Sequence, residues 1–178
     1  MILENYQTLR LQFRSLSLLD KEPLLAFFND PQATAYLSID SEDVNNYANV
    51  WIERQLKRYK SIGVGLCAIE LRGTGEFVGQ CGLVRQFVDG IPKWEVGYHL
   101  LPRYWGNGYA TEAAMACRDF CFENEMAETL ISIVDPLNVR SITVAKRNGM
   151  CFWKETIFKD VPVHVYKIRR EDWEKLVE

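Results

Sequence analysis

The stretch that decides the fold runs from Trp94 to Ala113 and reads WEVGYHLLPRYWGNGYATEA. Its first half is strand-like and ends at Pro102, and its second half turns through Gly106 and Gly108 before a helical period begins. Two glycines allow the backbone to turn tightly and to approach a ligand closely. Because the first turn of the following helix leaves N–H groups free, the loop predicts an anion site that fits a pyrophosphate. The alternative is a helix-entry turn that binds nothing.

Two other phosphate-binding loops do not match this stretch. A P-loop ends in Gly-Lys-Ser/Thr, whereas Tyr109 and Ala110 follow the last glycine here. A dinucleotide-binding fingerprint needs a third glycine or alanine where this chain has Thr111, and it normally opens at the first strand of a parallel unit. The loop therefore belongs to another class of phosphate site.

Outward from this stretch, apolar periodicity and turn residues predict a mixed chain of strands and helices. Strands are expected at residues 9–16, 64–71, 77–86, 93–101, 129–134, 151–158 and 162–168. Helices are expected from Asp20 to a stop at Asp30-Pro31, from an N-cap at Ser41 through Tyr59, at 108–125 and at 138–148, with a charged tail at the end. This order predicts an α/β (mixed α+β) domain built around one sheet.

The composition is that of an ordinary globular protein. The 178 residues are 48% apolar and 25% charged, which predicts a single domain spanning residues 1–178. The net charge of −3 argues against a nucleic-acid partner, and a mildly acidic surface would suit a cationic amine. We expect a cytoplasmic protein without a membrane partner, since the chain shows neither a secretory signal nor a membrane span. Five cysteines and two histidines match no zinc pattern, so we expect reduced thiols in the core and no metal.

A second motif lies downstream of the glycine loop and reads Asn138-x-x-Ser141, then Lys146-x-Asn148-Gly149-Met150. Together with Arg103-x-x-Gly106-x-Gly108, it resembles the cofactor motifs of the GNAT superfamily of N-acetyltransferases, whose signature is Gln/Arg-x-x-Gly-x-Gly/Ala. The branch that it resembles most includes ribosomal-protein N-terminal acetyltransferases and spermidine acetyltransferases. The opening Thr8-Leu9-Arg10-Leu11 is also typical of that branch. The resemblance covers nearly the whole chain but says little about the substrate.

The resemblance implies both a fold and a cosubstrate. The fold is a mostly antiparallel sheet of about seven strands with a splayed parallel pair, flanked by about four helices. Acetyl-coenzyme A would enter the splay, with its pantetheine arm along the fourth strand and its pyrophosphate on the glycine loop. The residues expected to bind it are His99, Leu100, Leu101, Arg103, Trp105, Gly106, Asn107, Gly108, Tyr109, Ala110, Asn138, Ser141 and Lys146.

Two of these residues have structural alternatives. Asn138 is also a preferred helix N-cap, and one side chain can serve both roles. Lys146 in the last turn of its helix can simply complement the helix dipole.

The family reaction is direct attack of a neutral amine on the thioester, which needs a base, an oxyanion donor and a proton donor for the thiolate. Glu95 is the candidate base, because partial burial on an apolar strand would raise its pKa; the alternatives are a solvated charge or a buried salt bridge. Backbone N–H groups at 96–98 are candidate oxyanion donors. Many relatives use a tyrosine as the thiolate's donor where this chain has Ala145. The branch that the chain resembles suggests Ser141 as the donor instead, and the alternative for Ser141 is a helix-surface hydroxyl.

Four other polar residues are weaker candidates. Tyr98 and Tyr166 are expected to be packing residues rather than proton donors. His99 is expected to pack on its strand rather than to act as a base. Glu112 is expected to be a first-turn acid that the helix dipole favours.

The resemblance implies transfer of an acetyl group from acetyl-coenzyme A to a primary amine, on a protein N-terminus or a small molecule. A catalytically silent module that binds acetyl-coenzyme A is the first alternative. An unrelated phosphate-binding protein is the second, and the paired motifs disfavour it. The N-terminal helices and the C-terminal hairpin set the acceptor, which the fold does not reveal. Homodimers are common among similar proteins, but the sequence leaves the oligomeric state open.

Overall fold

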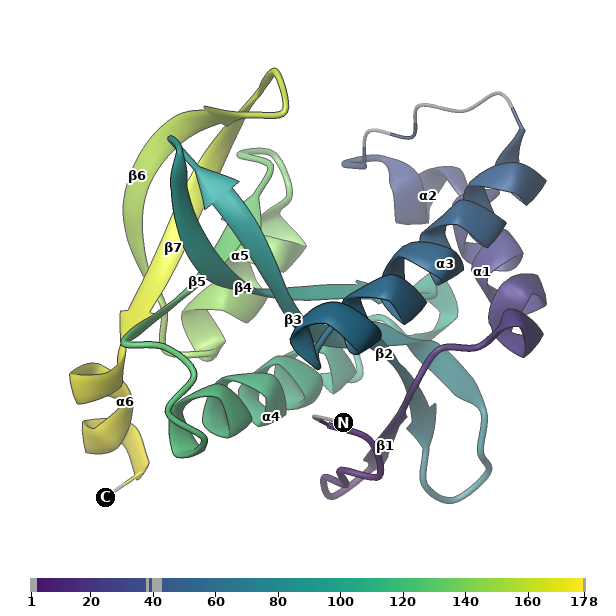
Figure 1. Cartoon of the computed structure of the whole chain (residues 1–178), viewed down its shortest axis with the longest axis horizontal. Coiled ribbons are helices and arrows are strands. Elements are labelled where there is room, and N and C mark those ends of the chain that lie inside the picture. Colours follow the sequence, from purple (N-terminus) through teal and green to yellow (C-terminus); the bar gives the residue numbers. More distant parts are fainter. Residues whose placement is uncertain (1–2, 38, 40–42, 178) are drawn as a thin grey trace.

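The structure is a computed structural model that describes residues 3–37, 39 and 43–177. Its centre is a seven-stranded sheet in the order β1-β2-β3-β4-β5-β7-β6. Neighbouring strands are antiparallel except β4 and β5, which are parallel. The strands, labelled in Figure 1, are β1 (Leu11–Arg14), β2 (Leu66–Leu71), β3 (Phe77–Val88), β4 (Ile91–Leu100), β5 (Thr129–Val134), β6 (Cys151–Phe158) and β7 (Val161–Arg169).

Six α-helices and two short 3-10 helices connect the strands within the described residues. The α-helices are α1 (Lys21–Phe28), α2 (Pro31–Thr34), α3 (Val44–Ile62), α4 (Tyr109–Glu123), α5 (Val139–Arg147) and α6 (Arg170–Val177). The 3-10 helices are η1 (Leu18–Asp20) and η2 (Pro102–Tyr104). None of the helices in the described part of the chain combines the length and the apolar character that a membrane span requires.

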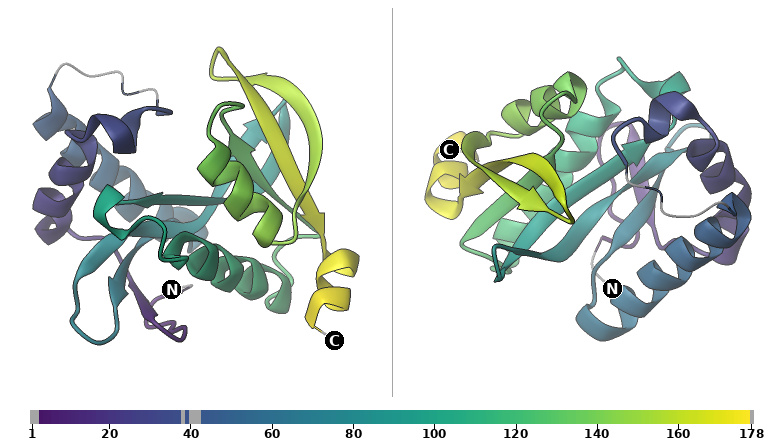
Figure 2. Two further views of the ribbon diagram at one scale, coloured as in Figure 1. Left: turned by 180° about the vertical axis from the view of Figure 1, so that it is seen from behind. Right: turned by 90° about the horizontal axis from the view of Figure 1, so that it is seen from above.

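The two largest apolar clusters of the described residues lie on opposite faces of the sheet. Cys67 and Ile69 of β2 pack in one core with Cys117 of α4, whereas Ala68 between them packs in the other with Ile52 of α3. The side chains alternate because successive residues of a strand point to opposite faces. Figure 2 shows these two layers of helices from two further directions. The helical wall of α1 and α3 thus lies on the face opposite to α4.

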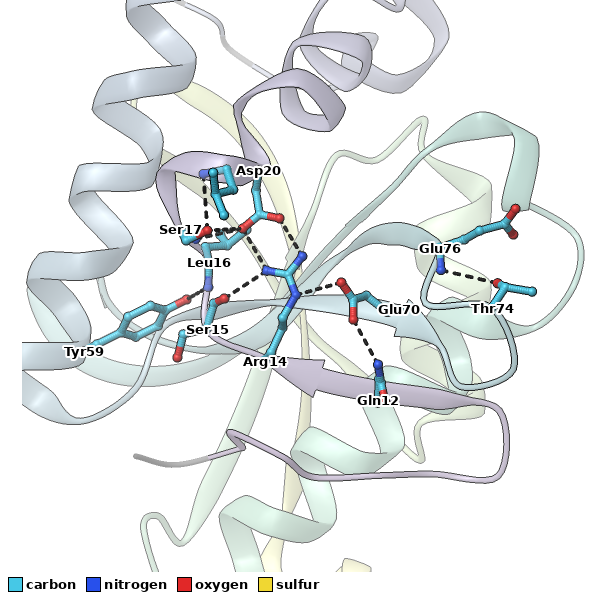
Figure 3. Close-up of polar contacts among 11 residues, drawn as sticks. Gln12, Arg14, Ser15, Leu16, Ser17, Asp20, Tyr59, Glu70, Thr74 and Glu76 are labelled. Carbon is cyan, nitrogen blue, oxygen red and sulfur yellow. Dashed lines mark hydrogen bonds and ion pairs between the residues drawn. The ribbon is translucent and has the colours of Figure 1, made fainter.

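A network of ion pairs and hydrogen bonds fixes α1 and α3 to the sheet (Figure 3). Arg14 donates to both carboxylate oxygens of Asp20 at 2.8 and 2.6 Å, and to Glu70 of β2 at 2.7 Å. Asp20 is only 3% exposed and ends η1 directly before α1. Tyr59 of α3 accepts a hydrogen bond from the backbone N–H of Leu16 at 3.2 Å. Charged and hydrogen-bonded groups therefore fix the start of α1 and the C-terminal part of α3 relative to the segment that follows β1.

The predicted fold class and the strand and helix ranges are confirmed within a few residues, with three differences. Ser41, the expected cap of the third helix, lies outside the described residues, and Asp43 caps α3 by accepting from Asn46 N at 3.1 Å. Asp30-Pro31 not only follows the end of α1 but also starts α2, because Asp30 caps it and proline suits the first helical position.

The third difference is the C-terminal segment, where a charged tail is expected and the structure has helix α6. Trp173 anchors this helix, because its ring packs 5.4 Å from that of Phe122 and its Nε1 donates to Asp119 at 2.7 Å. Helices α2 and α6 account for the excess over the expected four. Among the cysteines, Cys67, Cys81, Cys117 and Cys121 are buried as expected, whereas Cys151 is exposed on the edge strand β6.

Candidate active site

The site begins where the parallel strands β4 and β5 part. They pair only at Trp94–Leu130 and Glu95–Ile131, whereas β3 stays paired with β4 as far as Leu100. Beyond Glu95, β4 therefore has no strand partner on the β5 side. This confirms the splayed parallel pair, and it leaves an edge of β4 backbone that a bound molecule can reach.

A cavity of about 870 Å³ occupies the space that the splay opens. Its floor is β4; α2 and α3 lie on one side, and α5 with the turn between β6 and β7 lies on the other (Figure 1). This volume falls in the range of about 300–1,000 Å³ that is typical of small-molecule sites. The cavity is therefore large enough for the reacting parts of two substrates.

The loop between β4 and α4 closes one end of the cavity. Gly106 and Gly108 have φ angles of 78° and 81°, which favour glycine. A Cβ on Gly106 would meet nothing within 4 Å, so the backbone there is open to a ligand. Gly108 is the N-cap of α4 and supplies no side-chain cap, which leaves first-turn N–H groups for an anion. These features fit a pyrophosphate.

The same loop is braced from outside the cavity. Asn107 Nδ2 donates to the carbonyls of Tyr104 and Trp105 at 3.1 Å each. Arg10 Nη1 donates to the Asn107 carbonyl at 2.9 Å, and Arg10 Nε donates to Glu112 at 2.6 Å. Glu112 is thus an anchor for the N-terminal segment and more than a first-turn acid.

Helix α5 forms a second wall. Asn138 Oδ1 accepts from the backbone N–H of Ser141 at 3.1 Å, so Asn138 caps the helix while it lines the cavity. Arg140 and Arg147 also line the cavity, and the Arg140 guanidinium lies 4.6 Å from the centre of the Trp105 ring. The sequence interpretation missed both arginines, although their spacing of seven places them on one helix face.

The structure brings together most of the predicted residues for acetyl-coenzyme A. The cavity lining includes His99, Leu100, Trp105, Gly106, Gly108, Tyr109, Ala110, Asn138 and Ser141. Four others are not part of it. Leu101 is buried in the core with α1 and α3, and Arg103 is exposed with its guanidinium 5.0 Å from the Tyr104 ring centre. Asn107 and Lys146 are exposed.

Glu95, the candidate base, lies at the point where the strands part. Its Oε2 accepts from Gln86 Nε2 at 2.8 Å, and its Oε1 accepts from Ile133 N at 3.4 Å. Burial raises the pKa of Glu95 to about 6, although both hydrogen bonds and the charges of Lys159 and Arg58 act to lower it. No described residue forms a salt bridge with it. A carboxylate with this pKa is suited to accept a proton near neutral pH.

Ser141 and Tyr98 form a pair of hydroxyls across the splay. Ser141 Oγ lies 2.9 Å from Tyr98 Oη, which also donates to the Ser141 carbonyl at 3.1 Å. Burial raises the pKa of Tyr98, so its hydroxyl stays protonated at neutral pH. Ala145 and Tyr166 are both buried in the core. The sequence predicts Tyr98 to be a weaker candidate donor than Ser141. In the structure Tyr98 also lines the cavity, and its hydroxyl contacts that of Ser141.

His99 packs between two aromatic rings, as expected. Its ring centre lies 5.8 Å from that of Phe27 and 5.5 Å from that of Trp51. Burial lowers the pKa of His99 to about 4, so the imidazole is neutral at pH 7.

Comparison with known proteins agrees with this geometry. Residues 10–151 match the family model of the acetyltransferase (GNAT) domain. A Bacillus subtilis protein named YkkB is 37% identical over 161 residues, which cover 89% of this chain and 91% of YkkB. The crystal structure of an acetyltransferase from Agrobacterium tumefaciens is 29% identical, covers 93% of this chain and 94% of its own, and superposes with a TM-score of 0.81.

Two more distant structures share the fold. The ribosomal L7/L12 α-N-protein acetyltransferase RimL, in complex with coenzyme A, has 13% identity, a TM-score of 0.76 and coverage of 95% of this chain and 98% of its own. The spermidine N-acetyltransferase of Vibrio cholerae, in complex with coenzyme A and spermine, has 13% identity, a TM-score of 0.73 and coverage of 92% and 98%. These are the two kinds of enzyme in the branch that the sequence resembles. The chain belongs to the GNAT acetyltransferase family, and it is an acyltransferase.

Proposed function

We propose that this protein transfers an acetyl group from acetyl-coenzyme A to a primary amine. The observation that carries the proposal is one continuous cavity that joins the glycine loop, the unpaired edge of β4 and Glu95. The proposal assigns the glycine loop to the phosphates, the strand edge to the extended arm and Glu95 to proton transfer. The names of two structural neighbours, which include coenzyme A with a protein α-amine or a polyamine, agree with this choice.

The phosphate end of the cosubstrate fits the loop and α5. The open backbone at Gly106 and the N-terminus of α4 suit a pyrophosphate. Arg140 adds positive charge there, since its guanidinium lies 4.6 Å from the centre of the Trp105 ring, and Arg147 adds a further positive charge to the cavity lining. Arg10 contributes indirectly, because its bonds to Asn107 and Glu112 hold the loop in shape.

The chemistry uses the opposite end of the splay. Bound acetyl-coenzyme A supplies a thioester whose carbonyl carbon is open to attack. Glu95 takes a proton from the incoming ammonium, directly or through water, and leaves a neutral amine whose lone pair forms the new C–N bond. Backbone N–H groups at 96–98 are the candidate donors that stabilise the negative charge on the carbonyl oxygen.

When the C–S bond breaks, the departing thiolate needs a proton. Ser141 and Tyr98 are its candidate donors, since their hydroxyls lie 2.9 Å apart and line the same cavity. The raised pKa of Tyr98 keeps a proton on the pair throughout the neutral range. The new C–N bond leaves the nitrogen with one proton more than the amide keeps, and this proton passes, directly or through water, to the hydroxyl pair and replaces the one given to the thiolate. The products are an acetamide, a free thiol and a protonated Glu95, which releases its proton to water.

Binding of the cosubstrate is the first test. Saturating acetyl-coenzyme A should raise the melting temperature, because a ligand at about 100 times its Kd stabilises a protein by about 2.7 kcal/mol. NAD and ATP, which share parts of its structure, should have much smaller effects. A melting temperature that acetyl-coenzyme A leaves unchanged would overturn the proposal.

A further inference from the structure

The charges that line the cavity have the opposite balance to those of the chain. The whole chain has a net charge of −3. The charged side chains in the cavity lining are Arg54, Arg58, Arg140, Arg147 and Lys159 on the positive side, and Glu95 and Asp135 on the negative side. The mildly acidic composition, which suggested a cationic acceptor, therefore does not describe the site itself.

Arg58 and Lys159 of this lining act on the charge of the candidate base, and Arg54 acts in turn on the charge of Arg58. Arg58 is close enough to Glu95 for the two charges to affect each other's pKa. Glu95 is five residues from the end of β4 at Leu100, which corresponds to about 16 Å of extended strand before the glycine loop even begins. Arg58 is thus placed to meet the acceptor rather than the phosphates of the cosubstrate.

The two guanidiniums of α3 have no carboxylate partner among the described residues. Arg58 Nη1 donates to Gln55 Oε1 at 3.1 Å, and Arg54 lies 5.9 Å from the centre of the Trp51 ring. Burial and then the charge of Arg54 lower the pKa of Arg58, yet a guanidinium stays protonated at neutral pH. Two positive charges that face a cavity without a carboxylate paired to either favour the binding of an anion.

Helix α3 directs these cations into the cavity together with an aromatic surface. Tyr47, Trp51, Arg54 and Arg58 recur at spacings of three and four and all line the cavity. Gln55 ties Arg58 to the start of β2, since its Oε1 accepts hydrogen bonds from both Arg58 Nη1 and Leu66 N at 3.1 Å. A planar guanidinium held on this wall can bind both oxygens of a carboxylate.

We propose that the acceptor is an amino carboxylate, in which the reacting amine and a carboxylate belong to one small molecule, and that Arg58 with Arg54 binds the carboxylate. This inference rests on the proposed acetyl transfer and names its substrate class. The amine then lies toward Glu95 and the thioester while the carboxylate lies on α3. Polyamines are disfavoured, because an additional ammonium would face two arginines in place of the carboxylate.

The test measures kcat/KM for matched pairs of acceptors, corrected for the neutral fraction of each amine. The panel contains α-amino acids and ω-amino acids of increasing length, each with its carboxamide, and spermidine as the cationic reference. We expect each preferred carboxylate to exceed its carboxamide by about tenfold to a hundredfold, the worth of a hydrogen bond to a charged group. Equal or better turnover of the carboxamides or of spermidine overturns the inference and leaves acetyl transfer intact.

Two variants of α3 make the test specific. Arg58→Gln should remove most of the preference for the carboxylate, mainly through a higher KM. Lys57→Gln changes an exposed cation that does not line the cavity, so it should keep the preference. Equal effects of the two substitutions would contradict the assignment.

A binding measurement keeps the inference testable where no acceptor in the panel is acetylated. In protein saturated with coenzyme A, the carboxylates should raise the melting temperature more than their carboxamides do, and Arg58→Gln should abolish that difference. No difference in the unmodified protein overturns the inference. Failure of the proposed function itself is recognised separately, because acetyl-coenzyme A would then either not bind or bind without forming an acetamide from any amine.

Discussion

Replacing Glu95 with glutamine removes the proton acceptor while it keeps the volume and one hydrogen-bonding oxygen. We expect kcat/KM at neutral pH to fall by about 10²–10⁴-fold, the usual contribution of a general base. In the unmodified enzyme, kcat/KM should rise with pH through the Glu95 pKa of about 6 and then level off. The Glu95→Gln enzyme should lose this rise and regain part of its activity at high pH, where more of the amine is already neutral.

The same substitution should stabilise the fold. The pKa of Glu95 is about 6 in the folded protein against an ordinary value of 4.5, so between these values the folded state keeps a proton that the unfolded chain has lost. Stability therefore falls as the pH rises from 4.5 to 6, and above this window the ionised carboxylate costs up to about 2 kcal/mol. Because the carboxylate faces a cavity that water enters, we expect a gain of about 1 kcal/mol at pH 8 and little at pH 4.5.

Two assays on the same preparations check this reasoning. A pH–rate profile gives the loss of activity and the position of the rise, and urea unfolding at pH 4.5 and pH 8 gives the change in stability. A Glu95→Gln enzyme with an ordinary profile would show that another group takes the proton. A variant that is equally stable at both pH values would show that Glu95 is not desolvated in the folded state.

Three further changes address other parts of the site. Ser141→Ala should lower kcat by about tenfold at every pH, since only thiolate departure is affected; full kcat would rule it out as a donor. Gly108→Val should abolish acetyl-coenzyme A binding in calorimetry, whereas Gly75→Val, at a similar φ of 73° away from the cavity, should keep the affinity. Arg14→Met should lower the free energy of unfolding by about 3–5 kcal/mol in urea, because it leaves Asp20 buried and unpaired, and adding Asp20→Asn should restore part of the loss.

The sequence was sufficient for the parts of the site that local structure builds. A glycine loop between a strand and a helix specifies its own backbone, so Gly106 and Gly108 were placed correctly before any contact was known. The cap at Asn138 is equally local, since its partner Ser141 is three residues away. The splay of β4 and β5 came from the family resemblance and not from periodicity, because strand pairing is a long-range property.

The sequence was insufficient where contacts join distant segments. Tyr98 and Ser141 are 43 residues apart, and no pattern in the sequence predicts that their hydroxyls are in contact. Arg58 belongs to α3, in which the sequence shows mainly the apolar stripe that packs on the sheet. Whether Arg58 faces the cavity depends on how α3 packs, which the sequence does not reveal. The C-terminal helix was missed because its apolar anchor is a single residue, Trp173, whose burial depends on α4.

Acetyl transfer itself tests the central claim most directly. The protein is incubated with acetyl-coenzyme A labelled in the acetyl group and with a panel of amines, and both the free thiol and the labelled acetamide are measured. The account predicts one acetamide formed for each thiol released, with both rates falling together in Glu95→Gln. Saturable binding of acetyl-coenzyme A without any labelled acetamide would contradict it and identify a silent binding module.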